Sequence, residues 1–355
     1  MSLNIFPHLP VAANSQRCRL GARSMFEKNK IYSVHFLRFF AAAAVVVHHV
    51  LQRYTGKVTV GAAGVDVFFV ISGFVIGLAL QGNDTSTRFA VKRLIRVMPL
   101  YWTATLVYGY FRFVAWGLTP APSEILRSIF LWPPFGHPWY PIYYPAWTLE
   151  FEMLFYGIAT VCLIFFRKNA CNACLILVLC VSPILIQVPG SVRGTFPETQ
   201  FLLEFAAGIV VAQTIDILRA RLKPAIGLWL VLGALAIFAI NYTQTSARPI
   251  AWGVPSAMMV VGMIAFERTA WLKNRFIVLG GDASYAIYLT HITAIEFLGE
   301  AGKWWHIPFE KHLIIAFPLL IGAGIGCGIV AHLLIEKPML IVLRGFLLPK
   351  RTVIA

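Results

Sequence analysis

The chain has 355 residues, of which 59% are hydrophobic and only 13% are charged. Soluble proteins carry about 25% charged residues, so this composition excludes a soluble globular domain, a disordered chain and a secreted disulfide scaffold. The mean hydropathy is +0.74. Apolar runs of about 20 residues recur along the chain, which is the length that a helix needs to cross a bilayer. The composition therefore predicts an all-α, polytopic integral-membrane helical bundle.

Ten candidate spans can be placed along the chain. They lie at 31–51, 62–80, 98–116, 145–166, 171–188, 199–215, 224–240, 249–266, 279–298 and 313–335. With the N-terminus inside the cell, 21 of the 30 Lys and Arg residues fall in inner segments, 8 in outer segments and one within the first span. Basic residues gather on the cytoplasmic side of membrane proteins, so the count predicts that both termini lie inside. The net charge of +15 then reflects topology, and nucleic-acid binding is not expected.

Three regions follow from these spans. Residues 1–30 form a basic cytoplasmic segment, residues 31–335 a transmembrane domain and residues 336–355 a basic cytoplasmic tail. The expected environment is a lipid bilayer, most simply a bacterial inner membrane. A single C-x-x-C at Cys171 and Cys174 has no second pair of ligands, so no metal site is expected.

Ionisable residues mark the first span, IYSVHFLRFFAAAAVVVHHVL. A charge inside a span costs at least a few kcal/mol, which makes each such residue a functional candidate. Arg38 and His49 are about 20° from sharing one azimuth on a helix and about 16 Å apart along its axis. His48 points about 80–100° away. The spacing therefore favours His49 over His48, although histidines at an interface remain the simpler alternative.

The second span and the connector after it contain further candidates. Asp66 lies near the outer end of GVDVFFVISGF, where Ser72 and Gly73 are small enough to let another helix approach closely. In RFAVKRLIRVMP the basic side chains repeat at helical spacing and predict either contact with anionic lipid or a site for a polyanionic cofactor. Pro99 is expected to open the third span.

Two later spans carry polar groups at depth. Glu150 and Glu152 are about 200° apart, so only one can face an interior site, and the deeper Glu152 is the better candidate. In the ninth span Ser284, Tyr288 and His291 lie close to one face. A structural ion pair for Glu152 and a structural role for His291 are the alternatives.

These segments resemble the integral-membrane acyltransferase-3 family. The similarity rests on LRFFAAAAVVVHH, GVDVFFVISGF, KRLIRVMPLYW, PAWTLEFEMLFY and GDASYAIYLTH, which occur in the family's order between about residues 31 and 291. It resembles the short, membrane-only members of the family, and among these the ones that act on exopolysaccharides. Thr148 stands where the family more often has Ser.

The resemblance implies transfer of an acyl group, usually acetyl from acetyl-CoA, to a hydroxyl of a carbohydrate at the membrane. The family's first-span signature falls on Arg38 and His49, and its fourth-span Glu on Glu152, which would be the catalytic residues. Its paired arginines fall on Arg93 and Arg96, which are thought to face the CoA phosphates.

A mechanism can be stated as a hypothesis. Lys92 would assist the two arginines at the phosphates, and His49 would act as general base or carry the acyl group. Glu152 would orient His49 or balance its charge. The expected substrate-binding residues are Asp66, Trp147, Ser284, Tyr288 and His291.

Two other classes of function fit some of these features. A proton-coupled transporter or flippase of a polysaccharide pathway also uses intramembrane His, Glu and Arg. A sensor or assembly partner would keep the spans without needing Arg93 and His49. Acyl transfer by the purified protein would separate the enzyme from both.

Overall fold

The computed structural model describes residues 30–131, 141–186, 201–241, 248–307 and 309–348. Nearly all of the basic segment expected at 1–30, and residues 349–355 of the expected tail, lie outside these ranges. Within them the chain is helical and forms no strand. The helices are α2 Tyr32–Thr55, α3 Gly64–Leu80, α4 Ser86–Trp116, α5 Pro122–Phe130, α6 Trp147–Phe166, α7 Ala170–Ile186, α8 Phe201–Arg221, α9 Pro224–Ile240, α10 Val254–Ile264, α11 Arg275–Trp304, α12 Leu313–Ala331 and α13 Lys337–Leu347.

Each of the ten expected spans overlaps one of these helices, and five helical segments are long and apolar enough to cross a membrane. These segments are Tyr32–Thr55, Val60–Leu80, Tyr144–Ser182, Phe201–Arg221 and Leu313–Leu347. Helices α9 and α10 are apolar but shorter, whereas α4 and α11 are long but carry several charged side chains. The composition and the five segments identify an integral membrane protein.

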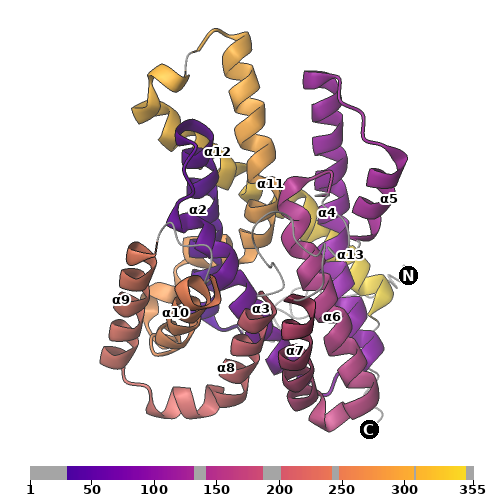
Figure 1. The fold of residues 1–355 in the computed structure, drawn as a ribbon, viewed down its shortest axis with the longest axis vertical. Helices are drawn as coiled ribbons and strands as arrows, with labels where there is room; N and C mark the ends of the chain where they lie inside the picture. The colour runs from indigo at the N-terminus through magenta and orange to yellow at the C-terminus, as the bar shows by residue number, and fades with distance from the viewer. Residues whose placement is uncertain (1–29, 132–140, 187–200, 242–247, 308, 349–355) are drawn as a thin grey trace, which may run out of the picture.

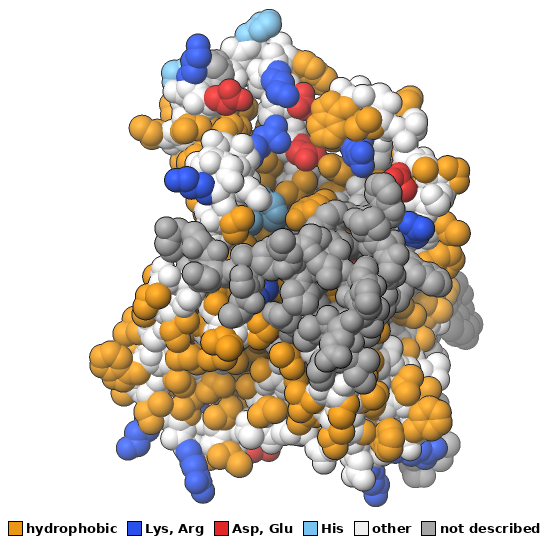
Figure 2. Space-filling model, viewed as in Figure 1, with side chains coloured by type: hydrophobic (Ala, Val, Ile, Leu, Met, Phe, Trp, Pro, Cys, Tyr) orange, Lys and Arg blue, Asp and Glu red, His pale blue; other side chains and the backbone are white. Residues whose placement is uncertain are grey.

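The surface is that of a protein surrounded by lipid. Large apolar side chains are exposed on many helices, with Leu106 75% and Ile314 91% accessible. Figure 2 shows hydrophobic side chains over most of the lower half of the visible face, Lys and Arg at its bottom edge, and mixed charges at the top. Exposed apolar area on this scale would make a soluble protein aggregate, but it is the surface that a bilayer requires.

Helix α4 differs from the expectation for the third span. The basic connector and the span form one continuous helix that begins at Ser86, so Pro99 lies inside the helix instead of opening it. The Thr85 side chain accepts a hydrogen bond from Arg88 N at 3.2 Å and caps the start of the helix. The N-cap at Thr85, almost four turns before Pro99, therefore sets the boundary, and the arginines at 93 and 96 become part of the bundle.

Close contacts between helices build the core. Helix α3 packs along α8, and α11 packs along both α2 and α12 (Figure 1). A Cβ atom added at Gly73 would lie 2.1 Å from the carbonyl oxygen of Phe205, and one added at Gly208 would lie 2.1 Å from that of Val70. Only glycine permits this approach of α3 and α8, which confirms the close helix contact expected at Gly73.

The start of helix α2 is fixed by two carboxylates from later in the chain. The carboxylate of Glu267 accepts hydrogen bonds from Tyr32 N at 2.7 Å and Ser33 N at 2.9 Å. The Lys30 ammonium pairs with Asp282 of α11 at 3.0 Å. These contacts satisfy free N–H groups at the helix N-terminus and hold α2 beside α11.

Candidate active site

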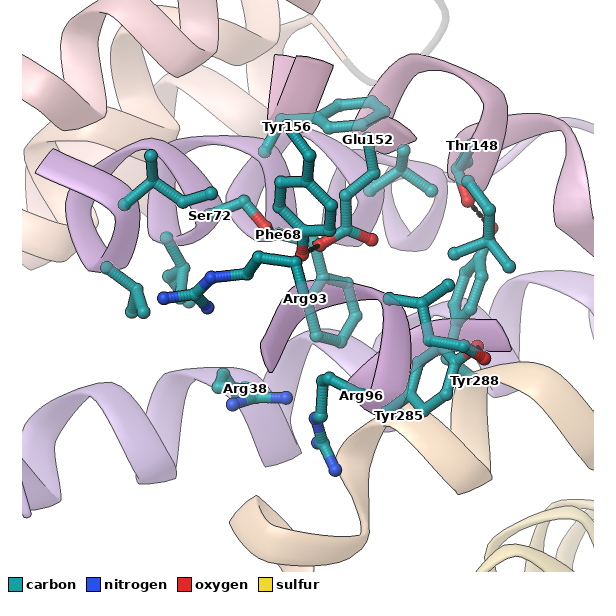
Figure 3. A pocket seen from close by; sticks show the side chains of 17 residues that line it. Arg38, Phe68, Ser72, Arg93, Arg96, Thr148, Glu152, Tyr156, Tyr285 and Tyr288 are labelled. Atoms are coloured by element: carbon teal, nitrogen blue, oxygen red, sulfur yellow. Dashed lines mark hydrogen bonds between the residues drawn. The ribbon is translucent and has the colours of Figure 1, made fainter. Parts of the chain in front are cut away.

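A cavity of about 110 Å³ lies between α2, α3, α4, α6 and α11. Figure 3 shows that its polar side chains converge from all five helices. The polar lining residues are Arg38, Ser72, Arg93, Arg96, Thr148, Glu152, Tyr156, Tyr285 and Tyr288. The rest of the wall is apolar, and includes Val65, Phe68 and Phe69 of α3.

The cavity is cationic. Arg38, Arg93 and Arg96 line it, and Glu152 is the one carboxylate among the lining residues. Within the described ranges no carboxylate oxygen lies within 4 Å of a nitrogen of Arg38 or Arg93. The Arg93 guanidinium instead lies 5.3 Å from the ring centre of Phe89 and 5.9 Å from that of Tyr156. Guanidinium groups that have no carboxylate partner among the described residues, in a largely apolar space, have the chemistry that suits a polyanion.

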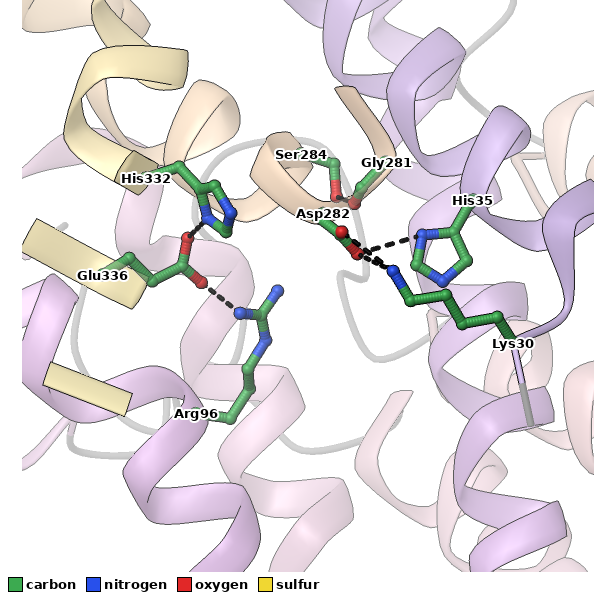
Figure 4. Close-up of polar contacts among 8 residues, drawn as sticks. All are labelled: Lys30, His35, Arg96, Gly281, Asp282, Ser284, His332 and Glu336. Carbon is green, nitrogen blue, oxygen red and sulfur yellow. Dashed lines mark hydrogen bonds and ion pairs between the residues drawn. The ribbon is translucent and has the colours of Figure 1, made fainter. Parts of the chain in front are cut away.

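Arg96 is the third arginine and has a carboxylate partner outside the cavity lining. It pairs with Glu336 in the π-helical turn His332–Glu336, and the other oxygen of this carboxylate is 2.7 Å from His332 Nδ1 (Figure 4). Its guanidinium also lies 5.4 Å from the ring centre of Tyr285. The Arg96 side chain is thereby held at the cavity wall by the C-terminal part of the bundle.

Glu152 is held by two hydroxyl groups on its own and a neighbouring helix. Its Oε1 accepts a hydrogen bond from Ser72 Oγ at 3.1 Å and another from the Tyr156 hydroxyl. Glu150, two residues earlier, is buried and does not line the cavity, so the helical phase selects Glu152 as expected. The expected contact between Glu152 and His49 is not formed among the described residues, and both hydroxyl groups donate to Oε1 of Glu152.

Tyr288 closes one part of the cavity. Its hydroxyl lies 3.0 Å from Thr148 Oγ1 and donates to the carbonyl of Pro145 at 3.0 Å. The backbone carbonyl of the same residue receives a hydrogen bond of 2.6 Å from His291 Nδ1. Tyr288 therefore connects the cavity to a second group of side chains around His291.

This second group is a pair of histidines from α2 and α11. His291 Nε2 lies 3.2 Å from His49 Nδ1, and the same nitrogen of His49 lies 3.0 Å from the carbonyl oxygen of Val45. His291 is fully buried, whereas His49 is partly exposed. His48 faces elsewhere and binds Thr59, whose N–H lies 3.2 Å from His48 Nδ1. The divergence of the two adjacent histidines follows their spacing on the helix.

Four residues expected in the site have other partners. Lys92 does not line the cavity and pairs with Asp84. Asp66 is fully buried and forms an ion pair with Arg248. The Ser284 hydroxyl donates to the carbonyl of Gly281 at 2.8 Å. Trp147 packs beside Phe201, with ring centres 5.4 Å apart. Each of the three polar side chains, Lys92, Asp66 and Ser284, therefore has a partner within the protein.

Several cavity residues were not singled out from the sequence as site residues. Ser72 was interpreted as a packing residue, and no role was assigned to Tyr156 or Tyr285. Tyr156 is four residues after Glu152, so helical spacing alone places it on the same face of α6. Tyr285 is three residues before Tyr288, which is the corresponding signal in α11. The position of Ser72 opposite Glu152 depends on how α3 and α6 pack.

The fold and the site define a class of protein: a helical membrane protein that has a buried cationic cavity and a histidine pair beside it. Residues 31–333 match the Acyltransferase domain family, and the chain belongs to this family. It is 30% identical over 304 residues to the "Exopolysaccharide production protein ExoZ" of Rhizobium meliloti (strain 1021), covering 82% of this chain and 93% of that one. It is 27% identical over 368 residues to the "Acyltransferase MdmB" of Streptomyces mycarofaciens, covering 87% and 91% respectively. No solved structure matches the chain. The protein is a membrane acyltransferase.

Proposed function

We propose that the protein transfers an acyl group, most simply acetyl, from acyl-CoA to a hydroxyl of an exported or cell-surface carbohydrate. The observation that carries this proposal is the cavity with three arginines and one carboxylate, which suits the phosphates of CoA. The name of the Rhizobium relative, a protein of exopolysaccharide production, supports a carbohydrate acceptor.

Arg93 and Arg96 bind the phosphate groups of the donor in this proposal. A guanidinium forms paired, charge-assisted hydrogen bonds with phosphate oxygens, and an excess of positive charge favours a polyanion over a neutral ligand. Arg38 lines the same cavity from α2 and faces the acyl end of the donor. Lys92 is left out of this set because, unlike Arg96, it does not line the cavity.

His49 accepts the proton of the attacking hydroxyl. It is partly exposed, so an acceptor can reach it, and it belongs to the helix that also carries Arg38. A neutral imidazole near pH 7 suits general-base catalysis. Glu152 balances the charge of the arginines, because its hydrogen-bond partners are in the cavity and not at His49.

The membrane arrangement completes the proposal. Ten helices cross the bacterial inner membrane with both termini in the cytoplasm, as the distribution of Lys and Arg favours. CoA enters from the cytoplasmic side, where helix α4 begins, and the carbohydrate reaches His49 from the outer side. The cavity and the histidine pair then lie along one path across the bundle.

Release of free CoA from acetyl-CoA tests this function. The purified protein in lipid nanodiscs is supplied with crude cell-envelope glycans, and His49→Ala is compared with His48→Gln. We expect turnover in the wild type and in His48→Gln, and a loss of at least about a hundredfold in His49→Ala. Full activity of His49→Ala would exclude its role as base. If the wild type released no CoA but moved glycans across the bilayer, the protein would instead be a transporter or flippase.

A further inference from the structure

The hydrogen bonds around His291 determine which of its nitrogens carries the proton. The Tyr288 carbonyl can only accept, so the 2.6 Å contact requires an N–H at His291 Nδ1. In a neutral imidazole the other nitrogen is then an acceptor, and His291 Nε2 is the atom that faces His49 at 3.2 Å. His291 is fully buried, which favours the neutral ring.

The same reasoning applies to His49. Its Nδ1 lies 3.0 Å from the Val45 carbonyl and 3.2 Å from His291 Nε2, and both partners can only accept. His49 Nδ1 therefore carries the proton, and His49 Nε2 has a free lone pair. His48 has the opposite arrangement, since its Nδ1 accepts from the Thr59 N–H. Of the two adjacent histidines, only His49 presents Nε2 as a base.

We propose that His291 is the positioning residue of the acyl transfer, and that it stabilises the imidazolium formed on His49 in place of a carboxylate. This inference rests on the proposed function. A catalytic histidine is normally held by an acceptor at its Nδ1–H, and in a triad this acceptor is a carboxylate. No carboxylate in the described part of the chain contacts His49; two acceptors share its Nδ1–H, the Val45 carbonyl oxygen at 3.0 Å and His291 Nε2 at 3.2 Å, and His291 is the side chain among them.

The proton balance of the step is complete. The acceptor hydroxyl loses its proton to His49 Nε2 while its oxygen forms a bond to the acyl carbon. The bond between that carbon and the CoA sulfur then breaks, and the thiolate leaves with the proton from His49 Nε2. Throughout, the Nδ1–H of His49 is shared between the Val45 carbonyl and His291 Nε2, and both hydrogen bonds are strongest when His49 is charged.

Two substitutions of His291 separate positioning from packing. His291→Leu removes the acceptor and keeps an apolar side chain in the buried site. His291→Gln offers an amide oxygen to His49 and an amide N–H to the Tyr288 carbonyl, and it cannot titrate. We expect kcat for CoA release to fall roughly tenfold to hundredfold in His291→Leu, with KM for acetyl-CoA unchanged, and to be largely restored in His291→Gln. Wild-type kcat in His291→Leu, or equal loss in both variants, would overturn the proposal.

A measurement that needs no turnover keeps the inference separate from the proposed function. Imidazole ¹⁵N spectra of labelled protein in nanodiscs report which nitrogen of each histidine carries the proton, and His49→Gln and His291→Gln assign the two signals. We expect protonated Nδ1 and unprotonated Nε2 on both rings. A proton on His49 Nε2 would overturn the assignment of His291 even if acyl transfer is observed. If the two rings show the expected protonation but the protein releases no CoA, the result would contradict the proposed function and not the assignment of the protons.

Discussion

The carboxylate of Asp66 accepts two hydrogen bonds from the guanidinium of Arg248, at 2.9 and 2.7 Å, across 182 residues of chain. Arg248 also lies against the rings of Phe201 and Trp252, 4.7 and 4.6 Å from their centres. The buried Glu204 carboxyl is within electrostatic reach of both partners and within hydrogen-bond reach of the Asp66 carboxylate. One guanidinium therefore compensates two buried acids where α3 and α8 begin.

Removal of the Arg248 side chain is expected to lower the stability of the fold more than removal of the Asp66 side chain. Arg248→Ala leaves two buried acids without a cation, whereas Asp66→Ala leaves Arg248 with Glu204. Breaking a buried ion pair costs about 3–5 kcal/mol, so both variants should unfold at lower temperature, Arg248→Ala more so. Thermal unfolding in detergent measures this order. If folded Asp66→Ala instead shows raised KM for the carbohydrate, Asp66 binds substrate after all.

Arg93→Ala should weaken CoA binding without unfolding the protein. Loss of a hydrogen bond to a charged group is worth about 1.5–3 kcal/mol, which corresponds to roughly a tenfold to hundredfold rise in Kd for CoA. The matched control is Lys92→Ala on the same helix, because Lys92 pairs with Asp84 and does not line the cavity. Calorimetric titration with CoA gives both values. An equal loss of CoA affinity in the two variants would mean that the CoA phosphates bind at the surface of α4 and not in the cavity.

Glu152→Gln should change donor binding in the opposite direction. The amide keeps a hydrogen-bond acceptor for Ser72 and Tyr156 and removes the one negative charge among the described residues that line the cavity. At an effective dielectric constant near 20, this charge opposes a nearby phosphate by at least about 1 kcal/mol. Kd for CoA is therefore expected to fall by about fivefold in the same titration. A rise would mean that Glu152 accepts a hydrogen bond from the donor.

Gly73→Ala tests the crossing of α3 and α8. The added methyl group would lie 2.1 Å from the Phe205 carbonyl oxygen, so the helices must separate, at a cost of about 1–3 kcal/mol or more. Gly157→Ala in α6 is the control, since nothing lies within 4 Å of an added Cβ there. We expect a lower melting temperature and a lower yield of monodisperse protein for Gly73→Ala only. An unchanged melting temperature would show that the two helices can separate freely.

The sequence predicts those features that depend on one helix at a time. Helical phase separates Glu152 from Glu150, and the structure has only Glu152 at the cavity. The spacing on the first span likewise separates His49 from His48, whose side chains have different partners. Apolar runs place a helix at each expected span, because a run of about 20 apolar residues has no other stable structure in a bilayer.

Features that depend on two helices could not be predicted. The contact of His49 with His291 requires α2 to pack along α11, and nothing in either segment specifies that neighbour. Arg248 is one of the eight basic residues that the sequence places in outer segments, and its pairing with Asp66 gives a structural role to a residue that was expected to bind substrate. The N-cap at Thr85 was also missed, so the basic connector was separated from the span that it begins.

Helix α2 carries Arg38 and His49 eleven residues apart on uninterrupted helix, with no Gly or Pro between them. Exchanging the alanines and valines in this stretch leaves the relative rotation of the two side chains unchanged. A single inserted or deleted residue would turn His49 by about 100° and move it about 1.5 Å along the axis, away from His291. The first span should therefore tolerate changes of residue type far better than changes of length, because its register sets the contact between His49 and His291.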